Sequence, residues 1–216
     1  NIPTEIGDGY AAVAPGDYHT CAATSTGAVH CWGQGANGQL GNGQTSGALT
    51  PSAVQGVSGV TGVASGEHHS CAKTSSGALY CGGGNGAGQL GDGATIGQTS
   101  PTLVTTAAFS GVSDVRAGYR HTCAVTADGV WCWGANDHGQ IGNGSTANAG
   151  LPTLVVGDGI AVTAGGYAAV DFPSASHTCA LTAAGRLLCW GSNASGQIGD
   201  NTLTGRTSPT EVSFDL

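Results

Sequence analysis

The stretch that decides the fold reads His121-Thr122-Cys123-Ala124, then Ala127-Asp128-Gly129, then Cys132-Trp133-Gly134 and Gly139-Gln140-Ile141-Gly142. It occurs four times. The other copies begin at His19, His69 and His177, so successive motif histidines are separated by 50, 52 and 56 residues. A spacing this regular is typical of repeat proteins, in which similar units stack and share a core.

Each copy contains four short segments of strand composition, separated by glycine-rich turns. An apolar segment precedes the histidine motif, the two cysteines flank one turn, and a Pro-x-x-hydrophobic segment closes the unit. These closing segments begin at Pro51, Pro101, Pro152 and Pro209, and a fifth begins at Pro3. Four short strands with evenly spaced turns are typical of a β-propeller blade, and no segment has helical periodicity.

The sequence therefore predicts an all-β chain of four four-stranded blades in one repeat domain over residues 1–216. Glycine accounts for 40 residues and only 8% of the chain is charged, but Val, Thr, Leu and Trp recur at fixed offsets, unlike a disordered chain. The predicted divisions are an orphan closing strand at 1–11 and repeats at 12–59, 60–111, 112–159 and 160–216.

All eight cysteines belong to the repeats, two in each. Each pair flanks a single turn, which places its members nearly opposite one another on adjacent antiparallel strands. Zinc is the alternative, since His-x-Cys presents two zinc-type ligands on one strand face. The even pairing within repeats favours disulfides, and these imply an oxidising compartment. The predicted pairs are Cys21–Cys31, Cys71–Cys81, Cys123–Cys132 and Cys179–Cys189.

The pattern Gly-x-x-His-Thr-Cys-Ala, Cys-Trp-Gly and Gly-Gln-Leu-Gly, followed by Pro-x-x-Val, resembles the regulator of chromosome condensation repeat. The resemblance covers nearly the whole chain and implies a β-propeller, which in that family usually has seven blades. The paired cysteines resemble those of secreted bacterial members. Four repeats imply an open or partial propeller, completed by another chain or by further blades.

The repeats depart from one another at three places. Gly82 replaces the tryptophan in the second repeat, and Gly35 replaces an asparagine in the first. The fourth repeat carries about eight extra residues between Gly166 and His177.

The net charge of −8, with Lys73 as the single lysine, argues against nucleic acid and anionic membranes as partners. No apolar run is long enough to span a bilayer, and no signal peptide is visible. We interpret Asn1 either as a mature N-terminus after processing or as the start of a fragment.

No enzymatic signature stands out. The nucleophile-elbow and zinc-protease motifs are absent, and Gly33-x-Gly35-x-x-Gly38 belongs to a repeated loop without a following helix. The repeated histidines suit either metal binding or, as we favour, hydrogen bonds to the backbone of a neighbouring blade. We expect no cofactor and no metal, because the acidic loop residues lack calcium-binding spacing.

Two regions are predicted to bind a partner. The first is the insertion in the fourth repeat, with Tyr167, Asp171 and Phe172, which breaks the repeat symmetry; covering a terminal blade is its alternative role. The second is the closing segments near the two ends, because unpaired strands invite pairing with another chain. Their key residues are Pro3, Ile6, Pro209 and Val212.

These observations predict a secreted, non-enzymatic repeat scaffold that mediates protein contacts, including contacts with its own copies that extend into a filament. The alternatives are a secreted protein-binding module or inhibitor and, less favoured, a lectin-like carbohydrate binder.

Overall fold

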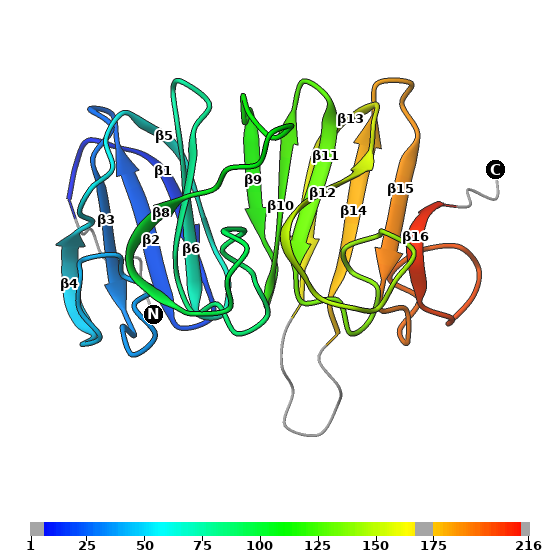
Figure 1. Ribbon diagram of the computed structural model, residues 1–216, viewed down its shortest axis with the longest axis horizontal. Coiled ribbons are helices and arrows are strands. Elements are labelled where there is room, and N and C mark those ends of the chain that lie inside the picture. Colours follow the sequence, from blue (N-terminus) through cyan, green and yellow to red (C-terminus); the bar gives the residue numbers. More distant parts are fainter. Residues whose placement is uncertain (1–6, 167–174, 213–216) are drawn as a thin grey trace.

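The computed structural model describes residues 7–166 and 175–212, which form four antiparallel sheets of four strands each. The sheets follow one another in chain order, and we call them blades 1 to 4 (Figure 1). No helix occurs in the described ranges. The prediction of four four-stranded blades is confirmed.

Within each blade the strands lie side by side in sequence order. The first strands are β1 (Tyr10–Pro15), β5 (Val60–Ser65), β9 (Asp114–Ala117) and β13 (Gly159–Gly165). The second strands, which carry the histidine motif, are β2 (His19–Thr24), β6 (His69–Thr74), β10 (His121–Thr126) and β14 (His177–Thr182). The third strands are β3 (Val29–Gly33), β7 (Leu79–Gly83), β11 (Gly129–Gly134) and β15 (Leu187–Gly191). The fourth strands are β4 (Ala48–Ala53), β8 (Gln98–Leu103), β12 (Ala149–Val156) and β16 (Arg206–Glu211).

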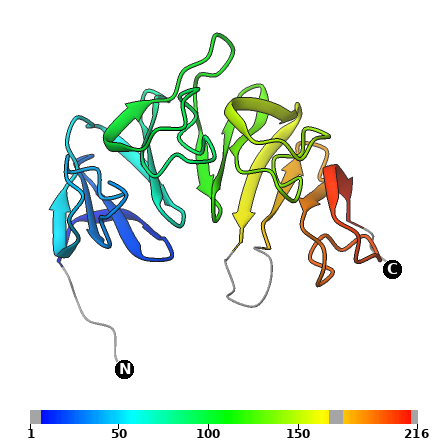
Figure 2. The ribbon, with the colours of Figure 1, turned by 60° about the horizontal axis from the view of Figure 1, so that its bottom comes forward.

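The blades stand around an arc, as Figure 2 shows. The first strands of successive blades are neighbours, whereas the fourth strands form the outer edges. Blades 1 and 4 lie at the two ends of the arc and do not meet (Figure 2). The described residues therefore form an open propeller, with one sheet face uncovered at each end.

The paired cysteines lie directly opposite one another in the strand register. Cys21 faces Cys31 across β2 and β3, and the same register holds in the other three blades. All four predicted pairs form disulfides, with Cα atoms 4.1 Å apart in each, and no free cysteine remains. The zinc alternative is therefore wrong.

Strand order fixes which loops share a side of the propeller. The loops from first to second strand and from third to fourth strand emerge on one side, the lower edge in Figure 1, which we call the loop face. Its described residues are 16–18, 34–47, 66–68, 84–97, 118–120, 135–148, 166, 175–176 and 192–205.

A tryptophan wedge packs each of the last two blades against the blade before it. Trp133 and Trp190 are completely buried. Their Nε1 atoms donate to the backbone oxygens of Gln89 and Gln140, at 3.0 and 2.9 Å. The indole of Trp133 lies so close to Gly91 that a Cβ there would come within 2.6 Å of Nε1. Only glycine fits at that contact.

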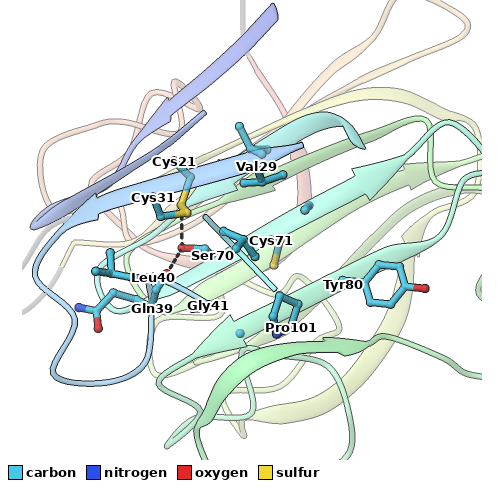
Figure 3. A pocket seen from close by; sticks show the side chains of 14 residues that line it. Cys21, Val29, Cys31, Gln39, Leu40, Gly41, Ser70, Cys71, Tyr80 and Pro101 are labelled. Atoms are coloured by element: carbon cyan, nitrogen blue, oxygen red, sulfur yellow. Dashed lines mark hydrogen bonds between the residues drawn. A yellow bond between two sulfur atoms is a disulfide. The ribbon is translucent and has the colours of Figure 1, made fainter. Parts of the chain in front are cut away.

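The junction between blades 1 and 2 lacks this wedge because Gly82 occupies the tryptophan position. A narrow apolar cavity of about 20 Å³ remains, lined by Leu40, Gly41, Tyr80 and Pro101 among others (Figure 3). The backbone oxygen of Gln39 accepts a hydrogen bond from Ser70 but none from an indole. This junction therefore lacks the indole-to-carbonyl hydrogen bond that the other two junctions have.

We predict that removing one disulfide destabilises the protein by about 2.5–3 kcal/mol, because each bridge closes a loop of about ten residues in the unfolded chain. The double variant Cys123→Ala/Cys132→Ala tests this through urea unfolding under non-reducing conditions. An unchanged midpoint and slope would show that the bridge adds no stability.

We predict that Gly82→Ala raises the free energy of unfolding by about 0.4–1 kcal/mol, because alanine restricts the unfolded chain and its methyl group fits beside a cavity of about 20 Å³. The backbone of Gly82 is not in the left-handed region, and a Cβ there meets only ordinary contacts of 3.4–3.5 Å. Trp133→Ala is the matched control, with an expected loss of about 3–5 kcal/mol. A folded Gly82→Ala variant less stable than the parent would contradict the prediction.

Candidate interaction surfaces

A histidine relay joins each blade to the next. The motif histidine approaches a hydroxyl of the following blade, and that hydroxyl bonds back to a glutamine backbone oxygen of the histidine's own blade. The three Nε2–Oγ contacts are His19–Ser70 at 2.7 Å, His69–Thr122 at 3.0 Å and His121–Thr178 at 3.0 Å. The return bonds run from Ser70 to Gln39, Thr122 to Gln89 and Thr178 to Gln140, at 2.8–2.9 Å.

The relay assigns the histidine tautomer. Because the hydroxyl proton goes to the glutamine oxygen, the hydroxyl oxygen must accept from Nε2–H. Among the described residues, the Nδ1 atoms of these histidines have no hydrogen-bond partner; in a neutral ring protonated at Nε2, Nδ1 is an acceptor and carries no proton to donate. Burial lowers the pKa of His19 and His121 to about 4 and that of His69 to about 3. The predicted acceptor was a neighbouring backbone; the structure corrects it to a neighbouring side chain.

The two ends of the arc present the unused halves of such a junction. His177 in blade 4 has no following hydroxyl among the described residues, and its ring is partly exposed. Thr20 in blade 1, the counterpart of Thr122, has no preceding glutamine. Trp32 is partly exposed, although its counterparts Trp133 and Trp190 are fully buried.

A second set of hydrogen bonds crosses each junction near the outer strands. Loop glycines donate from N to the next blade's outer strand: Gly43 to Thr99, Gly93 to Gly150 and Gly144 to Thr207, at 2.8–2.9 Å. The counterpart donor in blade 4 is Asn201, which keeps the left-handed backbone of these glycines with φ of 60°. The counterpart acceptor residue in blade 1 is Leu49, whose side chain is completely exposed.

Apolar side chains also remain uncovered at the blade 4 end. Leu181 is 38% exposed, whereas its counterparts Ala23 and Val125 are buried against the next blade. We call the sheet faces around Trp32 and Leu49 in blade 1 and around His177 and Leu181 in blade 4 the two open flanks.

The predicted partner-binding residues are only partly described. Pro209 lies in β16, the outer strand of blade 4, and Val212 follows it with its N–H bonded to Leu187. Both are half-buried. The outer strand β16 is the edge of its sheet, as β4, β8 and β12 are in the other blades. What distinguishes blade 4 is therefore its uncovered sheet face and not this edge strand. Pro3, Ile6, Tyr167, Asp171 and Phe172 lie outside the described residues.

A second polar constellation occupies the loop face where blades 1, 2 and 3 meet. The ring of Tyr18 stacks on His68 with 5.6 Å between ring centres. Tyr119 donates from Oη to Glu67 at 2.6 Å, and His68 Nε2 lies 3.2 Å from the same carboxylate oxygen. These contacts connect three successive blades through side chains that differ from repeat to repeat.

Burial and mutual proximity shift the pKa values of this constellation. Burial, followed by the hydrogen bond to Glu67, raises the pKa of Tyr119 to about 12, so its hydroxyl stays a donor. Burial and the charge of Glu67 raise the pKa of Asp17. The sequence alone did not predict this constellation. A sequence feature could have indicated it: the two residues directly before the motif histidine differ between repeats, although the motif around them is constant. They are Asp17-Tyr18, Glu67-His68 and Tyr119-Arg120.

The described residues contain no group of three or more His, Cys, Asp or Glu side chains poised to hold a metal ion. Within the same ranges, no helix has the length and apolar character to cross a membrane.

We predict that stability falls steeply between pH 6.5 and about 4. The buried histidines have folded pKa values below the ordinary 6.5, so in this window the unfolded chain binds protons that the folded chain excludes. Their stabilising contribution is complete above pH 6.5 and declines by up to about 1.4 kcal/mol per pH unit for each histidine. Thermal melts from pH 7.5 to 4.5 measure the slope. His69→Gln should reduce it by about one third; an unchanged slope would contradict this origin.

Comparison with known proteins agrees with this architecture. The repeat described as "Regulator of chromosome condensation (RCC1) repeat" matches residues 26–72, 76–125 and 128–170, and a second version of it matches 11–39, 112–140 and 174–197. The chain is 35% identical over 208 residues to the ultraviolet-B receptor UVR8 of Arabidopsis thaliana, covering 94% of this chain and 46% of the receptor. It is 33% identical over 205 residues to the human E3 ubiquitin-protein ligase HERC2, covering 93% of this chain and 4% of the ligase.

Among solved structures, Prp20p of Saccharomyces cerevisiae superposes with a TM-score of 0.80 at 25% identity, over 99% of this chain and 52% of Prp20p. The chain thus spans about half the length of UVR8 and of Prp20p. The repeated histidine, tryptophan and glycine contacts, the blade topology and these matches lead to one conclusion: the chain belongs to the RCC1 repeat family of β-propellers.

Proposed function

We propose that this protein is a non-enzymatic extracellular scaffold that assembles head to tail, with the blade 4 flank of one copy covering the blade 1 flank of the next. The observation that carries the proposal is the complementarity of the two open flanks. Among the described residues, each flank lacks what the other offers: His177 has no hydroxyl partner, and Thr20 has no preceding histidine and glutamine.

The three internal junctions show what such a contact would contain. Trp32 would donate to the backbone oxygen of Gln197, as Trp133 donates to Gln89. Leu49 would lose its full exposure to water, which is worth about 1.5–3 kcal/mol, and Leu181, which is 38% exposed, would contribute a smaller share. A contact between two different surfaces is heterologous, so it propagates into a filament unless the rotation closes a ring.

The four disulfides support the extracellular assignment, because such bridges persist in oxidising compartments. The histidines support the absence of catalysis. Three of them make nearly identical hydrogen bonds that join neighbouring blades. A catalytic acid and a catalytic base, in contrast, need environments that differ from each other.

A second candidate function is the binding of another protein through the loop face. The side chains that vary between repeats gather there on a rigid scaffold, which is where binding residues concentrate. The solved relative Prp20p is described with binding to Gsp1p and histones, and a yeast RCC1 structure contains Kap60. Protein contact is therefore a role already carried by this type of propeller.

We predict that the 216-residue chain forms oligomers whose size grows with concentration, measured by sedimentation velocity or by light scattering after gel filtration. Leu49→Glu and Leu181→Glu should each weaken association at least about tenfold, because each places a charge in an apolar contact. Ile96→Glu is the matched control, since Ile96 is 73% exposed in a blade 2 loop away from both flanks.

Mixing the two flank variants makes the test specific. Leu49→Glu retains an intact blade 4 flank and Leu181→Glu retains an intact blade 1 flank, so the mixture should give dimers and nothing larger. A parent chain that stays monomeric at high micromolar concentration would overturn head-to-tail assembly. A dimer insensitive to both substitutions would do the same.

A further inference from the structure

A cavity of about 440 Å³ opens on the loop face where blades 1, 2 and 3 meet. It lies beside the Tyr18–His68 stack and away from the blade 4 flank. Three blades supply its lining, which includes Asn37, Glu67, His68, Gly86, Tyr119 and Arg120.

Arg120 is the cation of this cavity, and its guanidinium has no partner among residues 7–166 and 175–212. In the part of the chain that the structure describes, every other Lys or Arg has a partner: Lys73 bonds Thr61, and Arg116, Arg186 and Arg206 pair with Asp114, Glu211 and Asp200. The side chain of Arg120 has neither a hydrogen bond nor an ion pair there, although the residue is half-buried.

Glu67 lines the same cavity but does not neutralise this cation. Its Oε1 atom accepts the hydroxyl of Tyr119 and lies beside Nε2 of His68, and no ion pair with Arg120 lies within 4 Å in the described residues. The carboxylate is thus held by two neighbouring rings. No described side chain therefore occupies the N–H donors of the Arg120 guanidinium.

Two glycines specific to the second repeat make the space. The positions of Gly84 and Gly86 carry larger side chains in the other repeats, with Ala36, Asp137 and Ala194 at the second of them. A Cβ at position 86 would lie 3.5 Å from Nη2 of Arg120. A side chain at 86 would therefore enter the space directly beside the guanidinium.

We propose that this cavity binds a carboxylate side chain, Asp or Glu, of an acidic polypeptide segment, with Arg120 as its bidentate donor. A planar carboxylate matches the fork of guanidinium donors. A phosphate dianion is disfavoured, because Glu67 and Asp17 lie close by and Arg120 is the single permanent cation of the lining. The ring of Tyr18, 57% exposed at the edge of the constellation, provides a surface for the chain that carries the carboxylate.

The test uses two peptides, acetyl-(Gly-Glu)3-amide and its uncharged counterpart acetyl-(Gly-Gln)3-amide, titrated into the 15N-labelled protein. The readout is the Nε–H resonance of each arginine. The acidic peptide should shift Arg120 in a saturable manner at low salt and leave Arg116 unshifted, while the glutamine peptide should shift neither. No saturable shift at Arg120, or equal shifts with both peptides, overturns the proposal.

Two substitutions then locate the site. Gly86→Asp introduces the residue that the third repeat has at the equivalent position and places an internal carboxylate beside Arg120, so it should weaken peptide binding at least about tenfold. Ala194→Asp makes the same charge change at the equivalent exposed position of blade 4 and should leave binding unchanged. Arg120→Gln should abolish binding, followed in this variant through the backbone amide resonances of Glu67, Gly86 and Tyr119, which line the same cavity.

Equal binding by the Gly86→Asp and Ala194→Asp proteins would overturn the assignment to this cavity. A third arm distinguishes the source of the carboxylate. Sodium glutarate that binds as tightly as the peptide would overturn the polypeptide assignment in favour of a small dicarboxylic acid.

Discussion

The structure depends on one buried hydrogen-bond relay, from histidine Nε2 to a hydroxyl of the next blade and back to a glutamine oxygen. Buried polar groups without partners are costly, so a blade that carries the histidine requires a neighbour that carries the hydroxyl. The relay recurs at three junctions with contacts of 2.7–3.0 Å, and it fixes how each blade meets the next. Stability in this propeller is consequently a property of junctions as much as of blades.

The residues of each repeat fall into two groups: those that build the junctions and recur, and those that differ from one repeat to the next. His19, His69 and His121 perform one task, and their neighbours Asp17, Glu67 and Tyr119 differ although each follows a glycine in the same loop. Variation on the loop face does not disturb the relay, because the variable side chains point to other partners, as Tyr119 does to Glu67. The constant relay holds the blades in place, and the variable loops give each junction a different set of side chains on the loop face.

The sequence predicted what is local and repeated. Strand order, the hairpins and the disulfides follow from spacings of about ten residues, as the register of Cys21 with Cys31 shows. The partner of His69 could not be read in this way, because Thr122 is 53 residues away and belongs to another sheet. The Arg120 cavity was equally invisible, since Asn37 and Arg120 come together only when three blades stack.

The low charge content gives the two proposed contacts different physical characters. The groups that build the junctions are neutral at pH 7, since burial lowers the pKa of the relay histidines far below it. A flank contact made from such groups relies on apolar burial and hydrogen bonds, which salt screens little. A carboxylate on the half-buried Arg120 relies on charge, which salt at 0.15 M screens over about 8 Å. The protein can therefore keep its blades together across a range of ionic strength while its loop-face contact responds to salt.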